Sequence, residues 1–264
     1  AGHLARAGHD VTVYNRTRAK AEATGLAVAD TPAAAARGAD AVVACVGNDD
    51  DLEQVTLGSE GAFAAMREEA VFVDHTTVSA DIARRLSERR ALVVDAPVSG
   101  GQAGAEKGAL SIMCGGSAEA FAAAEPVMQA YAARIVHVGD AGAGQQTKMV
   151  NQICIAGVLG GLSEGLRFAQ ASGLDLDKVF EAISGGAAQS WQMVNRWDTM
   201  AKDAFDFGFA IDWMRKDLGL ALDEARRSGA VLPVAALVDQ FYGEVQKMGG
   251  ARQDTSALVR RLAK

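Results

Sequence analysis

Short apolar runs rich in β-branched residues alternate with alanine-rich stretches through the first half of the chain. Such runs, bounded by turn-forming residues, predict strands. The predicted strands are Val11–Asn15, Ala41–Val46, Ala70–Thr77, Leu92–Pro97, Leu110–Cys114 and Arg134–Val138. The predicted helices between the first four are Thr17–Thr24, Thr31–Arg37, Asp51–Leu57 and Ser79–Arg90. Strands joined by helical crossovers predict an α/β domain with a parallel sheet covered on both faces. The close spacing of the last strands predicts an antiparallel or mixed edge.

The pattern changes at Gly142, after which no strand pattern follows. The stretch "GQQTKMVNQICIAGVLGGLSEGLRFAQASG" predicts one long helix, and because it is apolar nearly all round we expect it to be buried. Further helices are predicted at Asp175–Ser184, Ser190–Ala201, Asp212–Ser228 and Val234–Met248. The pattern therefore predicts two domains, an α/β domain at residues 1–141 and an all-helical domain at residues 142–264 that begins with the long helix.

The first residues, "AGHLARAGHDVTVYN", predict a short helix, a turn at Gly8 and a strand. These are the second half of a βαβ unit. Its first half is a strand followed by a glycine-rich phosphate turn, and the sequence contains neither. We therefore expect that the sequence given lacks this strand and turn.

The charge of the chain and its cysteines and histidines indicate which partners, compartment and metal sites to expect. The 264 residues include 26 basic and 33 acidic ones, for a net charge of −7, which argues against nucleic acid or an anionic membrane as the main partner. From the sequence we expect that no apolar run is long enough to span a bilayer. Cys45, Cys114 and Cys154 are scattered in apolar runs, which predicts buried thiols in a reducing, cytoplasmic compartment. The four histidines lack ligand spacing, so we expect no metal site.

The residues after the first predicted strand bear on a cofactor. In an NAD-binding βαβ unit, an Asp or Glu at this place accepts hydrogen bonds from the ribose hydroxyls. This chain has Asn15, Arg16 and Thr17 instead. A guanidinium pairs well with a phosphate, so the replacement predicts a preference for NADP. The alternative is a turn with an exposed arginine.

Two later segments carry candidate chemistry. "DAPVSGG" ends a strand in a turn, where the Ser99 hydroxyl and the backbone N–H groups of Gly100 and Gly101 are suited to bind a carboxylate. "GAGQQTKMVNQ" begins a helix on which Lys148, Asn151 and Gln152 share a face. The helix dipole and burial both disfavour an ammonium charge, so we expect Lys148 to exchange protons near neutral pH. A plain turn and a surface lysine are the alternatives.

In this order, "DAPVSGGQAGAEKGALSIMCGG", "GAGQQTKMVNQ" and "KDLGLAL" resemble the substrate-binding segment, the catalytic segment and the cofactor-side helix of the β-hydroxyacid dehydrogenase family. That family includes 3-hydroxyisobutyrate dehydrogenases, tartronate semialdehyde reductases and glyoxylate reductases. The resemblance covers the whole chain. It implies a Rossmann-type dinucleotide-binding domain, here without its first strand and Gly-rich loop, followed by an all-helical domain.

The resemblance also implies roles for single residues. Lys148 is similar to the catalytic lysine, and Asn151 would help orient the substrate. Many members have Asn where this chain has Gln152, which leaves open which of the two amides orients the substrate. The positions that match the carboxylate-binding turn are Ser99, Gly100 and Gly101. The positions that match the dinucleotide site are Val46, Gly47, Asn48, Thr77 and, in the second domain, Lys216.

The sequence thus predicts an oxidoreductase that transfers a hydride between NADP(H) and a small 3-hydroxy acid or its semialdehyde, with Lys148 as general acid and base. An NAD-linked enzyme of the same family and a catalytically silent dinucleotide-binding module remain alternatives. The apolar helices of the second domain also suggest a homodimer or homotetramer.

Overall fold

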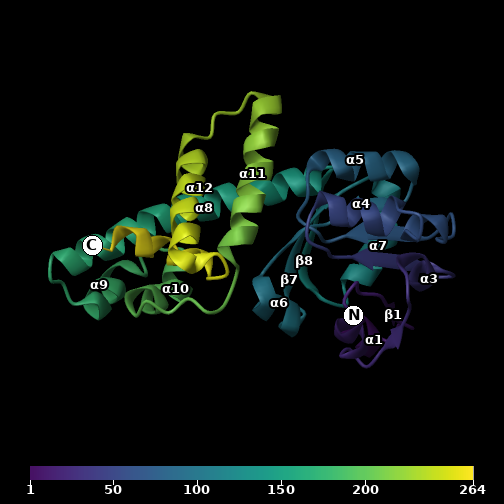
Figure 1. The fold of residues 1–264 in the computed structure, drawn as a ribbon, viewed down its shortest axis with the longest axis horizontal. Coiled ribbons are helices and arrows are strands. Elements are labelled where there is room, and N and C mark those ends of the chain that lie inside the picture. Colours follow the sequence, from purple (N-terminus) through teal and green to yellow (C-terminus); the bar gives the residue numbers. More distant parts are fainter. Residues whose placement is uncertain (264) are drawn as a thin grey trace. The chain divides into compact units, whose positions relative to one another are not determined.

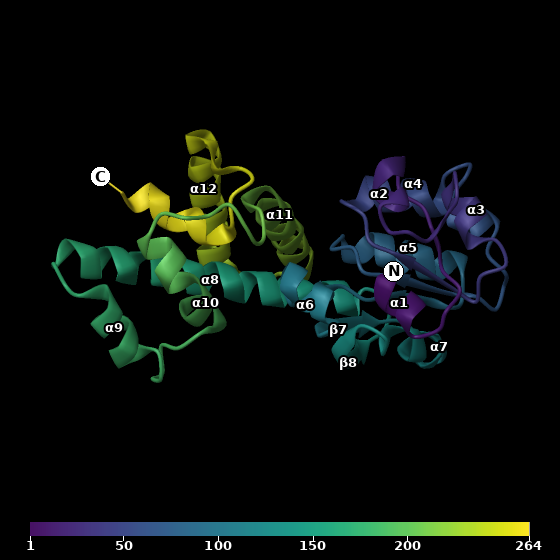
Figure 2. The same cartoon turned by 90° about the horizontal axis from the view of Figure 1, so that it is seen from below.

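The computed structural model describes residues 1–263 (Figures 1 and 2). The chain forms two compact units, which are described separately. Unit 1 is Ala1–Lys148, and unit 2 begins at Met149. The predicted domain boundary at residues 141 and 142 stays a prediction.

Unit 1 contains two sheets. Its strands are β1 (Thr12–Val13), β2 (Ala27–Val28), β3 (Ala41–Ala44), β4 (Val71–Asp74), β5 (Val93–Asp95), β6 (Val98–Ser99), β7 (Leu110–Gly115) and β8 (Ala132–Gly139). β1 and β2 form a parallel pair of their own, while the larger sheet has the order β3-β4-β5-β7-β6, with β8 also paired to β7. β3, β4 and β5 are parallel, and β7 is antiparallel to β5 and β6. The predicted mixed edge is therefore confirmed.

The helices of unit 1 cover both faces of the larger sheet. They are α1 (Gly2–Arg6), α2 (Arg18–Glu22), α3 (Pro32–Ala36), α4 (Asp49–Leu57), α5 (Ala80–Arg89), α6 (Gly101–Lys107), α7 (Ala118–Met128) and the 3₁₀ turn Ala62–Ala64. Leu52 of α4 and Ile82 of α5 pack with Phe72 in one core cluster. Ala124 of α7 packs with Val73 and Ile112 in another. Burial of apolar side chains on both faces explains why the central strands carry continuous apolar runs.

Unit 2 is helical. Its helices are α8 (Ala143–Ala171, which begins in unit 1), α9 (Leu176–Ile183), α10 (Trp191–Ala201), α11 (Ile211–Ser228) and α12 (Pro233–Val245), followed by the π turn Gln246–Gly250 and the 3₁₀ helix Thr255–Leu262. Their core cluster includes Leu159, Trp197, Met214 and Tyr242. Figure 1 shows α11 and α12 as a helical hairpin. Burial raises the pKa of the Tyr242 hydroxyl, as expected for a phenol inside this core.

Three expectations from the sequence need correction, two about burial and one about a membrane-spanning helix. Helix α8 is not buried all round, because Val150, Val158 and Phe168 are exposed along it. Cys45 and Cys154 are exposed, and only Cys114 is buried. By length and composition, α8 also passes as a helix that could cross a membrane, contrary to the expectation from the sequence. This is weak evidence, since the core helix of a globular domain passes the same test.

Candidate active site

The carboxyl ends of three strands in unit 1 carry most of the residues predicted to bind a dinucleotide. Asn15, Arg16 and Thr17 follow β1, and the Asn15 side chain accepts a hydrogen bond from the Thr17 N–H (2.8 Å). Val46, Gly47 and Asn48 follow β3, and Thr77 follows β4. The carboxyl ends of parallel strands in α/β sheets are the usual place for a ligand crevice.

Three hydrogen bonds connect these strand ends. Arg16 Nη1 donates to Asp51 Oδ1 of α4 (2.8 Å), and Asn48 Oδ1 accepts from the Asp51 N–H (2.8 Å) as the cap of that helix. The Val46 N–H donates to Thr76 Oγ1 (3.0 Å). The structure therefore brings residues 15–17, 46–48 and 77 to one edge of unit 1. The Arg16 side chain is 74% exposed, so its guanidinium is accessible to a ligand.

The predicted substrate turn lies between β6 and α6. Ser99 ends β6, and Gly100 and Gly101 have φ angles of +126° and +60°. Residues with a Cβ rarely adopt such angles, so the two glycines permit this turn. Gly100 precedes the first residue of α6 and leaves the turn's backbone accessible.

Lys148 lies close to this turn. Its side chain is largely buried, with the residue 8% exposed, and Nζ donates to the carbonyl oxygen of Val98 (2.9 Å), next to Ser99. The structure therefore does not support the alternative that Lys148 is a surface lysine.

The beginning of α8, which carries Lys148, is held by two buried residues that the sequence reasoning did not select. Asp95 ends β5, and its carboxylate accepts from the N–H groups of Gly142 (2.8 Å) and Gln145 (2.9 Å). The Gln145 side chain donates to the Thr76 carbonyl (2.7 Å) and accepts from the Val78 N–H (3.1 Å). The only signal in the sequence was the position of Asp95 at the start of "DAPVSGG", which does not reveal partners 47 and 50 residues away.

Burial raises the pKa of two carboxyl groups at these strand ends. Asp95 has a pKa raised to about 6 by burial, although backbone N–H groups of Gly142 and Gln145 favour its charged form. Its neighbour in the sheet is Asp74 of β4, whose pKa burial raises to about 7. The Asp74 Oδ2 atom is buried and has no hydrogen-bond partner among the described residues. A buried carboxylate without a cation is costly, which explains the direction of both shifts.

In unit 2, three polar residues form a hydrogen-bonded chain, and Lys216 forms an ion pair with its last member. Asn151 Nδ2 donates to Gln152 Oε1 (2.7 Å), and Gln152 Nε2 donates to Asp217 Oδ2 (2.7 Å). Lys216 Nζ lies 2.9 Å from Asp217 Oδ1. Asp217 and Gln152 are buried, so this is a buried network rather than a solvated charge run. The resemblance implied a place for Lys216 in the dinucleotide site, but no role was predicted for Asp217.

The structure thus groups the predicted site residues into three sets. The first set is at the strand ends of unit 1, the second is the Ser99–Gly101 turn with Lys148, and the third is Asn151, Gln152 and Lys216 in unit 2. Lys148 and Asn151 are one turn apart on the continuous helix α8.

Comparison with known families decides the assignment. Residues 1–139 match the profile described as the NAD binding domain of 6-phosphogluconate dehydrogenase. Residues 142–262 match the profile described as the NAD-binding domain of NADP-dependent 3-hydroxyisobutyrate dehydrogenase. The chain belongs to the β-hydroxyacid dehydrogenase family. It is accordingly an NAD(P)-dependent hydroxyacid dehydrogenase with a Rossmann-like sheet domain and a helical domain.

Relatives of this β-hydroxyacid dehydrogenase align over nearly its whole length. An uncharacterized oxidoreductase of Shewanella frigidimarina is 61% identical over all of this chain and 94% of its own. The 2-hydroxy-3-oxopropionate reductase of Escherichia coli is 34% identical over 98% of this chain and 91% of its own. The structure of Mycobacterium tuberculosis 3-hydroxyisobutyrate dehydrogenase with L-serine superimposes with a TM-score of 0.89 at 29% identity, covering 100% of this chain and 94% of that one.

The strand-end residues of this dehydrogenase fit a dinucleotide. Arg16 offers an accessible guanidinium for a phosphate, and Asn15 and Thr17 offer amide and hydroxyl groups beside it. Gly47 and Asn48 leave the end of β3 without a bulky side chain. A dinucleotide needs such donors together with close access to the backbone.

Among residues 1–263, no group of three or more His, Cys, Asp or Glu side chains is placed to hold a metal ion.

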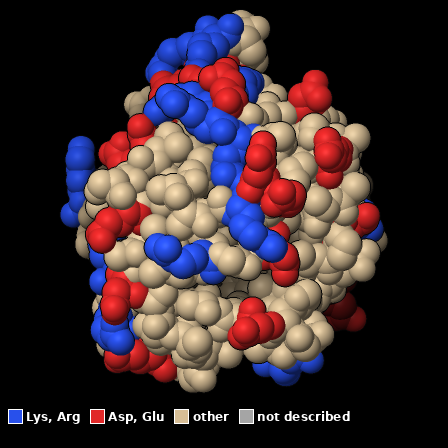
Figure 3. Space-filling model, turned by 90° about the vertical axis from the view of Figure 1, so that its right-hand side faces the viewer, with Lys and Arg blue, Asp and Glu red and all other residues tan. Residues whose placement is uncertain are grey.

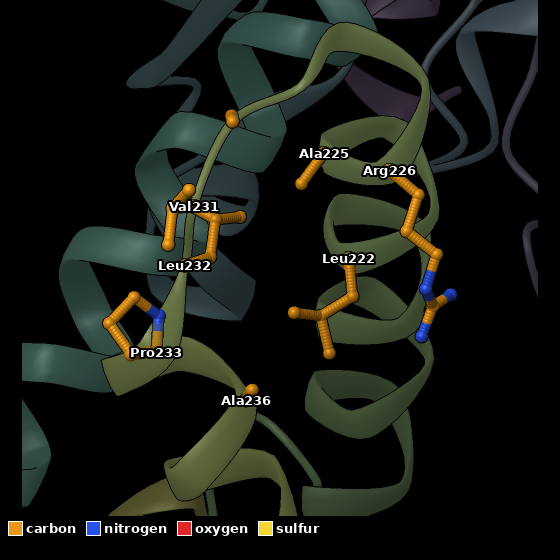
Figure 4. A pocket seen from close by; sticks show the side chains of 8 residues that line it. Leu222, Ala225, Arg226, Val231, Leu232, Pro233 and Ala236 are labelled. Carbon is orange, nitrogen blue, oxygen red and sulfur yellow. The ribbon is translucent and has the colours of Figure 1, made fainter.

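A shallow apolar groove of the dehydrogenase lies between the end of α11 and the start of α12, where Leu222 and Ala225 face the segment that carries Val231 and Leu232 (Figure 4). The Arg226 guanidinium lies on the outer side of α11 and pairs with Asp223. No predicted site residue lines this groove.

Proposed function

We propose that the protein transfers a hydride between NADP(H) and a small 3-hydroxy acid or its semialdehyde, with Lys148 as general acid and base. The observation that carries the proposal is the placement of a largely buried Lys148 Nζ 2.9 Å from the carbonyl of Val98, next to the Ser99–Gly101 turn. A proton donor beside a backbone turn suited to a carboxylate is the arrangement that this reaction needs.

Each group of residues has its own proposed role in the reaction. The turn at Ser99, Gly100 and Gly101 binds the substrate carboxylate through N–H and hydroxyl groups. Lys148 donates a proton to the carbonyl oxygen of the semialdehyde in reduction, and accepts the hydroxyl proton of the 3-hydroxy acid in oxidation. The dinucleotide, when bound, supplies the hydride in reduction and takes it in oxidation.

Asn151 is proposed to orient the substrate, and Gln152 to support it. Gln152 already donates to Asp217 and accepts from Asn151, so its amide is engaged at both ends. The Asn151 side-chain oxygen is not used in the contact with Gln152 and is able to accept a hydrogen bond from a hydroxyl group. This favours Asn151 for the orienting role that the sequence left open.

The preference for NADP rests on Arg16. Its guanidinium is exposed and forms an ion pair with Asp51, which a 2′-phosphate is expected to replace. Asn15, Thr17, Val46, Gly47, Asn48, Thr77 and Lys216 complete the proposed dinucleotide site. NAD as the preferred cofactor is the alternative within the same family.

The decisive experiment follows absorbance at 340 nm with NADPH or NADH and a panel that includes 2-hydroxy-3-oxopropionate, succinic semialdehyde and methylmalonate semialdehyde. Turnover of at least one semialdehyde, faster with NADPH, is expected. Tight NADPH binding without turnover of any of them would favour a silent dinucleotide-binding module instead.

Metal ions are not proposed to take part. Activity is therefore expected to survive incubation with EDTA and passage through a desalting column. Loss of turnover on chelation, with recovery upon addition of one divalent ion, would contradict this part of the proposal.

We propose that the protein is a homodimer or homotetramer that contacts its copy through α8. Exposed small or apolar residues follow each other on α8 at intervals of three or four positions: Val150, Cys154, Val158, Gly161, Gly165 and Phe168. Such spacing is typical of a helix-packing seam, and the glycines permit close approach. Sedimentation velocity is expected to show an oligomer that Phe168→Glu weakens, whereas a monomeric wild type would contradict the proposal.

No nucleic acid or membrane is proposed as a partner, and the proposed location is the cytoplasm. On the face of the molecule in Figure 3, basic side chains lie beside acidic ones rather than forming a continuous basic surface. The net charge of −7 points the same way.

A further inference from the structure

The first turn of α8 is attached to the sheet of unit 1 by a buried carboxylate. Asp95 is 2% exposed, and its two oxygens accept from the N–H groups of Gly142 and Gln145. Gly142 directly precedes the helix and Gln145 lies in its first turn, where N–H groups have no partner within the helix. An acceptor with negative charge at this end also interacts favourably with the helix dipole.

The space around the carboxylate permits little movement. A Cβ atom at Gly115 would lie 2.5 Å from Asp95 Oδ1, and one at Gly144 would lie 2.8 Å from Oδ2. Only glycine at these two positions leaves room for the carboxylate between β7 and α8. The position of Asp95 therefore determines where the helix begins.

Gln145 forms a second attachment in the same turn. It is fully buried, and its amide bonds both the Thr76 carbonyl and the Val78 N–H after β4. One attachment sets a point on the helix, whereas two attachments, to the ends of β4 and β5, also set its rotation about its own axis.

Lys148 lies one turn beyond these attachments, three residues after Gln145 and four after Gly144. Its Nζ reaches the Val98 carbonyl, only three residues after Asp95 on the same segment of chain. The segment from Asp95 to Val98 thus contacts α8 twice, once at its first turn and once through the lysine. A rotation or shift of the first turn would move Nζ away from Val98 and the adjacent Ser99–Gly101 turn.

We propose that Asp95, assisted by Gln145, is the positioning residue for the proton-transferring Lys148. The proposal rests on the proposed function of Lys148. Asp95 acts through the helix and does not contact the substrate. Its loss should lower kcat while cofactor affinity stays nearly unchanged, because misplacement of a reacting group by about 1 Å costs roughly 100-fold in rate.

The test compares Asp95→Asn with Asp74→Asn. Both replace a buried carboxyl group at a strand end, and the two residues are direct neighbours in the sheet, but the Asp74 carboxylate accepts from the Thr76 N–H rather than from α8. Asparagine keeps the shape and one acceptor, yet places an N–H₂ group toward the second helix N–H. We expect a roughly tenfold to hundredfold lower kcat for Asp95→Asn only. The NADPH affinity, measured by fluorescence, should stay within about twofold, as expected where no cofactor contact is removed.

Two further measurements separate positioning from loss of structure. Hydrogen exchange of the amides at residues 142–148 should be faster in Asp95→Asn than in Asp74→Asn. Gln145→Met removes the second attachment alone and should also lower kcat, which provides the test if Asp95→Asn does not fold.

A double variant separates this proposal from the proposed function. If Asp95 acts only through the lysine, Asp95→Asn adds little to the loss already caused by Lys148→Ala. Wild-type kcat in folded Asp95→Asn and Gln145→Met, or full additivity of Asp95→Asn and Lys148→Ala, would overturn the positioning role. Near-normal kcat in Lys148→Ala would instead overturn the proposed function.

Discussion

Unit 1 buries Asp74 and Asp95 against backbone N–H groups, whereas unit 2 buries Asp217 and Asp254 against cations. Asp217 pairs with Lys216, and Asp254 pairs with Arg196. No described Lys or Arg forms an ion pair with Asp74 or Asp95, and burial raises the pKa of both. A buried carboxyl group without a cation nearby tends toward the neutral form, which accounts for the raised pKa values of Asp74 and Asp95.

The same contrast separates the two lysines of the candidate site. Lys148 donates to the carbonyl of Val98, and Lys216 contacts the carboxylate of Asp217. This difference in printed contacts fits the proposed roles, proton transfer for Lys148 and cofactor binding for Lys216.

The largest effect is expected from the lysines. Lys148→Ala should lower kcat by about 10²- to 10⁴-fold, the usual contribution of a general acid or base, with little change in NADPH affinity. Lys148→Arg should not restore it, because guanidinium does not release a proton near neutral pH. Steady-state kinetics with saturating cofactor measure both.

Lys216→Ala is the matched control. It should weaken NADPH binding and leave kcat at saturating NADPH close to the wild-type value. If both alanine variants reduced kcat equally, the contrast between the two lysines would be wrong.

A smaller effect is expected at Arg16. A charge-assisted contact to a phosphate is worth about 1.5–3 kcal/mol, or roughly ten- to a hundredfold in affinity. Arg16→Ala should therefore lower the affinity for NADPH by that factor and hardly change the affinity for NADH, as measured by fluorescence titration. If Arg16→Ala weakened the binding of NADPH and NADH equally, Arg16 would not contact the 2′-phosphate, and the preference for NADP would lack an explanation.

The last prediction concerns stability rather than kinetics, and its subject is the buried carboxyl group of Asp74. Its folded pKa of about 7 lies above its ordinary value, so the native state binds the proton more tightly than the unfolded chain does. The wild type therefore loses stability as the pH rises from about 4 to about 7, by about 1.4 kcal/mol for each unit of pKa difference. Asp74→Asn removes this loss, so its Tm relative to wild type should rise between pH 5 and pH 8. A constant difference across that range would mean that Asp74 does not titrate there.

Alternating apolar and alanine-rich segments were enough to predict most of the fold. The positions of β3, β4, β5 and α8 followed from apolar runs and helix-forming residues, although each strand is shorter than predicted. The two-residue strands β2 and β6 are too short for any periodicity. Helix α7, although alanine-rich and capped by Ser117, was missed between the two strands that it connects.

The candidate site could be predicted where it depends on local backbone. The Ser99–Gly101 turn is marked by its glycines, and Lys148 by its place in a helix start. The attachments of Asp95 and the Gln152–Asp217 pair join residues 47 to 65 positions apart, and no spacing rule connects such positions. These contacts became visible only with the tertiary structure.

The central claim is that Lys148 transfers a proton rather than merely holding the substrate, and chemical rescue of Lys148→Ala tests it most directly. The variant is assayed with NADPH and the best semialdehyde of the panel while methylamine and ethylamine are added, with Lys216→Ala as control. The account predicts that the amines restore part of kcat in Lys148→Ala, more at a pH where more of the amine carries the proton to be donated, and change nothing in Lys216→Ala. A kcat for Lys148→Ala that is near normal without amine would contradict the account.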